Sequence, residues 1–78
     1  MSPRDFTLVD EFIRLDQLLK AADLVSTGGE AKIRIQEGEI MVDGEVEIRR
    51  GRKIRAGMRV QLEEEIILVH GAAPEASP

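Results

Sequence analysis

The stretch Gly38–Ile48, GEIMVDGEVEI, is the part of the sequence that decides the fold. It places Asp43-Gly44 between two β-prone runs, residues 39–42 and 45–48. A type I′ turn needs positive φ at both of its central residues, and Asp-Gly is a pair that tolerates this conformation. The stretch therefore predicts a β-hairpin whose strands are these two runs.

A short amphipathic helix is predicted before the hairpin. Its apolar residues recur at i, i+3, i+4 and i+7, namely Leu15, Leu18, Leu19 and Ala22. The helix would have about two turns and end near Asp23. Asp16 fits as its N-cap or first-turn acid, and we expect Asp16 to pair with Lys20 one turn later.

A second helix is predicted between the first helix and the hairpin. The run Thr27–Glu30 fits a capping box, in which the Thr hydroxyl and the Glu carboxylate each accept a backbone N–H left unpaired at the helix start. The helix would run from Gly28 to Glu37 and stop at Gly38, a suitable C-terminal glycine. Residues 31–35 also alternate as a strand would, but the capping box and the glycine favour the helix.

Further short strands are predicted on both sides of these elements, in the runs at residues 6–9, 12–15, 60–62 and 66–69. The first two runs form one or two strands, and the last two flank a solvated turn at Glu63–Glu65. Ala56-Gly57 is typical of a tight turn.

The length of 78 residues predicts a single domain, expected over residues 1–70, with a disordered tail at residues 71–78. The chain has no cysteine, so disulfide and thiolate chemistry are excluded. No stretch reaches the roughly 20 apolar residues of a membrane span, and the N-terminus has no apolar core of a signal peptide. We therefore expect a cytoplasmic protein with no membrane partner.

The charge of the chain is unevenly distributed. Of its 11 Lys and Arg residues, six lie in the segment Arg49–Arg59, RRGRKIRAGMR, whereas all 15 Asp and Glu residues lie outside this segment. The net charge of −4 therefore hides a basic patch on an acidic body. Such a patch indicates a polyanionic partner, and nucleic acid is the leading candidate.

Five cations in this segment could bind phosphate: Arg49, Arg50, Arg52, Lys53 and Arg55. They repel one another unless an anion is supplied, and guanidinium groups match phosphate oxygens bidentately. Gly51 allows the backbone to come close to a ligand or to turn sharply. Ile54 is expected to anchor the segment to the core. The alternative is a solvated loop whose charges offset the acidic body.

The second predicted helix offers a smaller basic element. Lys32 and Gln36 fall one turn apart on one face, and Gly28 and Gly29 stand at the helix start. A helix N-terminus favours an anion through its unpaired N–H groups. The alternative is that Lys32 and Arg34 are ordinary solvated residues.

Catalysis is weakly supported by the sequence. His70 is the single histidine, with no cysteine or second histidine to complete a catalytic or zinc site, so we expect a surface residue, no enzyme activity, no metal and no cofactor. The aromatic residues are Phe6 and Phe12 alone, which argues against a platform for stacking single-stranded bases. Recognition of the backbone and shape of structured RNA is more plausible.

The order of the motifs resembles the S-four-type RNA-binding domain, named for the fourth protein of the small ribosomal subunit. The resemblance lies in four motifs over roughly residues 12–69: RLDQLL at Arg14–Leu19, STGGEAK at Ser26–Lys32, GEIMVDG at Gly38–Gly44 and GMRV at Gly57–Val60. Together with RRGRK at residues 49–53, these motifs are most similar to the small stand-alone S-four-like proteins of bacteria.

The resemblance implies an α+β fold of two short packed helices against a small, mostly antiparallel sheet, the αL motif. It also implies RNA binding through the second helix, the preceding turn and the adjacent loop, at Ser26, Gly28, Gly29, Lys32, Arg49, Arg50, Arg52 and Lys53. The expected partner is structured or ribosomal RNA.

Two other readings of the sequence remain open. The first is a protein-interaction module that docks its basic loop on an acidic partner such as a ribosome-associated factor. The second is a sulfur carrier of the β-grasp type, which ranks last because the chain ends in Glu75–Pro78 and not in the Gly-Gly that carriers activate.

Overall fold

The computed structural model describes residues 3–71 of the chain. In chain order its elements are β1 (Arg4–Thr7), β2 (Phe12–Arg14), α1 (Leu15–Ala21), α2 (Gly28–Gln36), β3 (Ile40–Val42), β4 (Glu45–Val46), β5 (Lys53–Arg55), β6 (Arg59–Leu62) and β7 (Glu65–His70). The tail predicted at residues 71–78 lies outside the described residues except for Gly71. No helix within residues 3–71 is long and apolar enough to cross a membrane.

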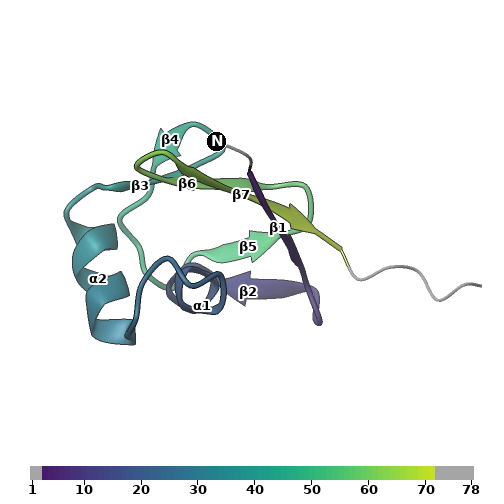
Figure 1. Ribbon diagram of the computed structural model, residues 1–78, viewed down its shortest axis with the longest axis horizontal. Helices are drawn as coiled ribbons and strands as arrows, with labels where there is room; N and C mark the ends of the chain where they lie inside the picture. The colour runs from purple at the N-terminus through teal and green to yellow at the C-terminus, as the bar shows by residue number, and fades with distance from the viewer. Residues whose placement is uncertain (1–2, 72–78) are drawn as a thin grey trace, which may run out of the picture.

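The strands form a main sheet and a separate two-stranded ribbon. The main sheet has the order β1-β7-β6-β3-β4, and its pairs are antiparallel except for the parallel pair of β1 and β7. The ribbon pairs β2 with β5 in antiparallel orientation. Figure 1 shows α1 and the ribbon beneath the main sheet and α2 at one end of the molecule. The predicted α+β fold, two short helices with a mostly antiparallel sheet, is therefore confirmed.

The hairpin predicted at Asp43-Gly44 is present as β3 and β4. Both turn residues have positive φ, 51° at Asp43 and 86° at Gly44, as a type I′ turn requires. The second strand ends at Val46 and not at Ile48 as predicted. The Glu47 N–H still donates to the Ile40 carbonyl of β3 at 2.9 Å, and its buried side chain lies beside Arg49 and Arg52.

The second helix begins with the predicted capping box. The hydroxyl of Thr27 accepts the Glu30 N–H at 3.1 Å, and the Glu30 carboxylate accepts the Ser26 N–H at 2.9 Å. Glu30 thus reaches one residue farther back than the usual motif, which closes on the N-cap itself. Gly38, with φ of 78°, lies two residues past the last helical residue, so the helix prediction is confirmed and the strand alternative is wrong.

The first helix is also present, but its predicted ion pair is wrong. The Asp16 carboxylate lies 3.2 Å from the guanidinium of Arg14, and within residues 3–71 no ion pair joins Asp16 to Lys20. Asp16 also accepts the Gln17 N–H at 2.8 Å, as a first-turn acid does. Because Arg14 is the N-cap residue, its side chain lies near the first turn and pairs with Asp16.

The core is filled from both helices, the main sheet and the ribbon. Its fully buried side chains are Leu15, Leu18, Leu19, Ala31, Ile35, Ile40, Ile54, Val60 and Ile67. Ile54 is the contribution of β5, so the predicted anchoring of the basic segment by this residue is confirmed. The cations around it are therefore attached to the folded body.

Replacing this anchor should cost much of the stability of the domain. We expect Ile54→Ala to lower the free energy of unfolding by about 2–5 kcal/mol, because it removes buried methyl groups and leaves a cavity. The control Ile33→Ala, at a residue 57% exposed on α2, should change it by less than about 0.5 kcal/mol. Urea unfolding measures both values, and similar losses for the two variants would contradict the anchoring role.

Candidate nucleic-acid interface

The basic segment consists of a turn and a strand, and not of one loop as the sequence predicted. Residues 49–52 form the turn, which the Arg52 N–H closes on the Arg49 carbonyl at 3.2 Å. Lys53–Arg55 is strand β5, because its alternation lets Ile54 face the core while its two cations face outward. The cations therefore occupy fixed positions along about seven residues of ordered backbone.

The turn is docked on the start of α1. The Leu15 N–H donates to the Arg52 carbonyl at 2.9 Å, and the Asp16 N–H donates to the Arg50 carbonyl at 3.1 Å. The first N–H groups of a helix have no partner within the helix, so the turn satisfies two of them. The predicted neighbour of the basic segment was α2, but these hydrogen bonds join it to α1.

A buried carboxylate organises the arginines of this turn. Glu47 is 7% exposed, and one of its oxygens accepts the backbone N–H and the Nε–H of Arg49, both at 3.0 Å. Its other oxygen accepts hydrogen bonds from Nη1 of Arg52 at 2.8 Å and from Nη2 of Arg49 at 3.2 Å. Hydrogen bonds from Arg49 lower the pKa of Glu47 to about 2 even though burial opposes this change. The same contacts raise the pKa of Arg49.

Sequence reasoning missed Glu47 as part of this site. The available signal was an acid two residues before the first arginine of the segment. The alternation of residues 45–48 obscured it, because such a pattern usually buries the apolar positions. In the structure Val46 is 58% and Ile48 61% exposed, and the acid between them is the buried residue.

The cations of the segment fall into two groups. Arg49 and Arg52 are held by Glu47, whereas Arg50, Lys53 and Arg55 are exposed and have no ion pair within residues 3–71. A surface hollow of about 610 Å³ joins the two groups, lined by Arg49, Gly51, Arg52, Lys53, Arg55 and Met58. An anion at this hollow would be surrounded by cations from the turn and from β5.

The outer face of the β2–β5 ribbon extends the cationic surface. Phe12 pairs with Arg55 and Arg14 pairs with Lys53, so these four side chains share one face, while Ile13 and Ile54 share the other. The Phe12 ring centroid lies 4.9 Å from Nζ of Lys53 and 5.5 Å from the guanidinium carbon of Arg55. The sequence did not predict this pairing, which brings Arg14 and Phe12 to the candidate interface.

The start of α2 presents a weaker site than predicted. Ser26, Gly28, Gly29 and Lys32 are all exposed, but the Ser26 N–H is occupied by the carboxylate of Glu30. This acid stands in the first turn, where an incoming anion would meet it.

The other cation of α2 is neutralised by acids. Arg34 lies 3.0 Å from Glu39, 3.2 Å from Glu63 and 3.8 Å from Glu30, and its hydrogen bonds to Glu39 and then Glu63 raise its pKa. Lys32 is therefore the remaining cation of this helix that has no ion pair within residues 3–71.

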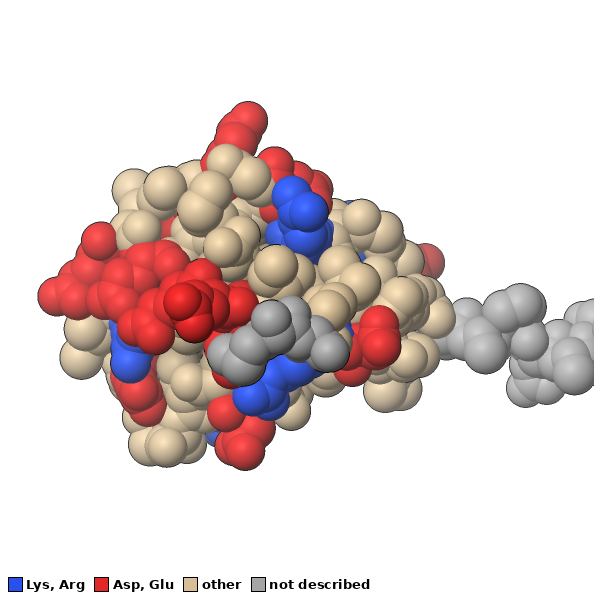
Figure 2. Space-filling model, turned by 45° about the horizontal axis from the view of Figure 1, so that its top comes forward, with Lys and Arg blue, Asp and Glu red and all other residues tan. Residues whose placement is uncertain are grey.

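The acids of the chain gather on a different part of the surface. Figure 2 shows acidic side chains concentrated at the end of the molecule that holds α2 and the turn between β6 and β7. Glu63 and Glu64 form this turn and are exposed, which confirms the predicted solvated turn at these two residues, whereas Glu65 is half-buried and begins β7. This arrangement repels a polyanion from that end and leaves the basic turn and ribbon as the attractive surface.

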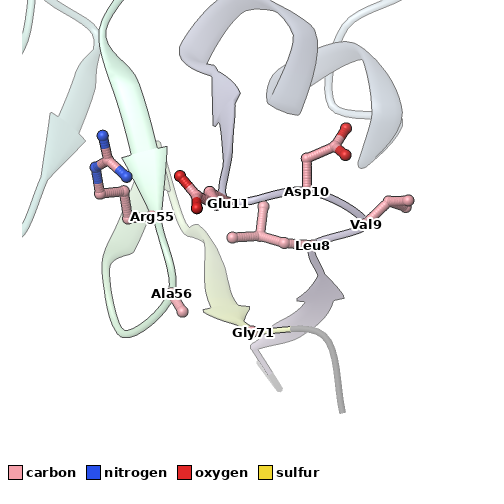
Figure 3. Close-up of a pocket in the computed structure, with 7 residues that line it drawn as sticks. All are labelled: Leu8, Val9, Asp10, Glu11, Arg55, Ala56 and Gly71. Atoms are coloured by element: carbon pink, nitrogen blue, oxygen red, sulfur yellow. The ribbon is translucent and has the colours of Figure 1, made fainter. Parts of the chain in front are cut away.

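Another hollow of about 770 Å³ lies beside the ribbon, lined by Leu8, Val9, Asp10, Glu11, Arg55, Ala56 and Gly71. Figure 3 shows the guanidinium of Arg55 pointing away from Leu8 and Glu11. Because Asp10 and Glu11 line this hollow and the guanidinium of Arg55 points away from it, the hollow does not favour an anion. Within residues 3–71 no group of three or more His, Asp or Glu side chains could hold a metal ion.

His70 is placed as a surface residue at the end of β7. Its Nε2 lies 2.7 Å from Oδ1 of Asp5, across the parallel pair of β1 and β7. Its side chain is 50% exposed, which agrees with the predicted surface role.

The fold and this surface together define a small α+β domain with a cationic turn and ribbon on its surface. The chain belongs to the S4 domain family, whose model matches residues 6–70.

Relatives in two bacteria are similar to this chain. RlbA of Bacillus subtilis strain 168, named for ribosome maturation, is 45% identical over 53 residues, which cover 68% of this chain and 75% of that protein. YbcJ of Escherichia coli K12, named for RNA binding, is 46% identical over 48 residues, which cover 62% of this chain and 69% of that protein. The solution structure of YbcJ, described as an αL motif involved in RNA binding, matches with a TM-score of 0.67 and 37% identity over 85% of both chains.

These comparisons confirm the family resemblance and the αL fold expected from the sequence. The relatives are named for RNA binding and ribosome maturation, and neither is named for catalysis. This agrees with the expectation of a non-catalytic protein.

Because the carboxylate of Glu47 is buried and charged, its contribution to the free energy of unfolding should depend on pH. We expect Glu47→Gln to lower the free energy of unfolding by roughly 1–3 kcal/mol at neutral pH, because hydrogen bonds to charged partners are lost in a buried place. The folded pKa, about 2, lies below the ordinary value of 4.5, so the contribution of Glu47 is complete above pH 4.5. It declines as the pH falls from 4.5 toward 2.

Urea unfolding at a series of pH values measures this effect. The difference between the wild type and Glu47→Gln should shrink as the pH falls through this window. The control is Glu64→Gln in the exposed β6–β7 turn, which should match the wild type at each pH. A difference that stays constant down to pH 2 would contradict the proposed ion cluster.

Proposed function

We propose that this protein is a non-catalytic RNA-binding protein that contacts the phosphate backbone of structured RNA. The main contact is the turn at residues 49–52 together with strand β5, at Arg49, Arg50, Arg52, Lys53 and Arg55. Ser26, Gly28, Gly29 and Lys32 at the start of α2 make a second, smaller contact. The observation that carries the proposal is the concentration of cations on one ordered segment of an acidic protein.

The arrangement of the arginines supports phosphate as the ligand. Glu47 holds the guanidinium groups of Arg49 and Arg52 in place, so less conformational entropy is lost when they bind. Arg49 keeps its outer side exposed, since 70% of its side chain remains accessible. Arg50 is exposed beside them, and its guanidinium has no ion pair in the described part of the chain and can bind two phosphate oxygens.

The names of the relatives support RNA as the polyanion. YbcJ is named for RNA binding and RlbA for ribosome maturation, and the chain covers more than two thirds of each. We therefore propose that the structured RNA is ribosomal RNA or its precursor, bound in the cytoplasm.

Salt dependence tests the phosphate contacts. With about five contacts, the logarithm of the association constant should fall against the logarithm of the salt concentration with a slope of about −4 to −5. Fluorescence anisotropy of labelled ribosomal RNA fragments over a range of salt concentrations measures this slope. Binding that is insensitive to salt would overturn the proposed contacts.

Neutralising the exposed cations tests their location. The variant Arg50→Gln/Lys53→Gln/Arg55→Gln leaves the cluster of Glu47 intact and should reduce the magnitude of the slope by about 3, one unit for each lost contact. The control Lys20→Gln removes an exposed cation of α1 and should leave the slope unchanged. An equal change in the two variants would mean that the binding surface is elsewhere.

The alternative is that the basic turn docks on an acidic protein. Capture of partners from a lysate before and after nuclease treatment distinguishes the two functions. RNA binding predicts that the association disappears with the RNA, whereas a direct protein partner survives nuclease and would still require the cations of β5.

A further inference from the structure

We infer that Phe12 is a stacking site for one unpaired nucleobase of the bound RNA, and that Lys53 and Arg55 bind the phosphates that flank this base. The inference rests on the proposed function and adds a recognition element to it. It assigns to the outer face of the β2–β5 ribbon a preference for RNA that has an unpaired nucleotide.

The position of the Phe12 ring sets it apart from the core. The inner face of the ribbon is complete without it, because Ile13 and Ile54 pair there and Ile54 is fully buried. Phe12 lies on the outer face and is 37% exposed. The exposed part of the ring is accessible to a ligand, and the cationic groups of Lys53 and Arg55 lie over it.

The ring lies between an apolar hollow and a cationic one. The apolar hollow, of about 220 Å³, includes Phe12 and is lined mainly by Phe6, Leu8, Val9 and Ile13, with polar groups from Asp10 and Gln17. On the other side, Lys53 and Arg55 contact the ring and also line the cationic hollow of the turn. A nucleotide has the same division, with an apolar base face and an anionic phosphate.

The side chains around the apolar hollow suit a base. Val9 is 88% exposed there, so a base stacked on Phe12 would also cover an apolar side chain that water now contacts. The amide of Gln17 and the carboxylate of Asp10 can exchange hydrogen bonds with the polar edge of the base.

The energies allow the base to take the place of the cations at the ring. Cation–π contacts at an exposed site are weak, and a stacked base is held at least as strongly as one such contact. The two cations that leave the ring, Lys53 and Arg55, form charge-assisted contacts with the phosphates of the same strand, which offsets the loss of both cation–π contacts.

The test compares two RNA probes at low ionic strength. One is a labelled, fully paired RNA hairpin, and the other is the same hairpin with one unpaired 2-aminopurine in its stem. The wild type should bind the second probe more tightly and quench its 2-aminopurine fluorescence, since stacking quenches this base. Phe12→Leu keeps an apolar side chain of similar size but removes the ring.

We expect Phe12→Leu to weaken binding of the bulged probe by roughly 5- to 150-fold and to abolish the quenching. Its affinity for the paired probe should stay within about twofold, because the phosphate contacts remain. The control Ile33→Ala, an exposed apolar residue on α2, should change neither affinity. Circular dichroism establishes that each variant is folded.

Two results would overturn the inference while leaving the proposed function intact. One is equal binding of the two probes by the wild type, and the other is an unchanged affinity of Phe12→Leu for the bulged probe. Failure of the wild type to bind either probe or any ribosomal fragment would instead overturn the proposed function, and the inference with it.

Discussion

The ion cluster of Glu47 with Arg49 and Arg52 is the interaction on which the candidate nucleic-acid interface depends. Each component would be unfavourable alone, because a buried carboxylate loses its hydration and adjacent cations repel one another. Together they satisfy both oxygens of Glu47 and fix the turn that leads into β5. Removal of either partner would leave a charge without compensation, which is why this cluster constrains the position of the whole basic segment.

The docking of this segment on α1 and β2 gives the domain a single cationic surface. The turn satisfies N–H groups at the start of α1, and Ile54 fixes β5 to the core. The cations therefore belong to rigid elements, which lowers the entropic cost of binding an anion. Acids gather at the end near α2, where Arg34 is surrounded by three of them. Repulsion there and attraction at the turn would orient an approaching RNA.

The structure contains the basic segment that the sequence predicted, but the surroundings of its cations were not predicted. The five cations of residues 49–55 do lie on an exposed, anchored segment. Their neighbour is α1, and their local anion is Glu47, neither of which was predicted. Phe12 and Arg14 join the surface only through the pairing of β2 with β5. A strand pairing between segments about forty residues apart has no local signature, so a scan for clustered charge does not include them.

The sequence by itself determined the elements whose stabilising contacts are local. The Asp43-Gly44 turn, the cap made by Thr27 and Glu30, and the leucine stripe of α1 each depend on residues within a few positions, and each is present in the structure. The tertiary structure alone decided the burial of Glu47, the neutralisation of Arg34 by Glu63 and the exposure of Phe12. These depend on which distant segments pack together, and burial and charge compensation exist only once that packing has formed.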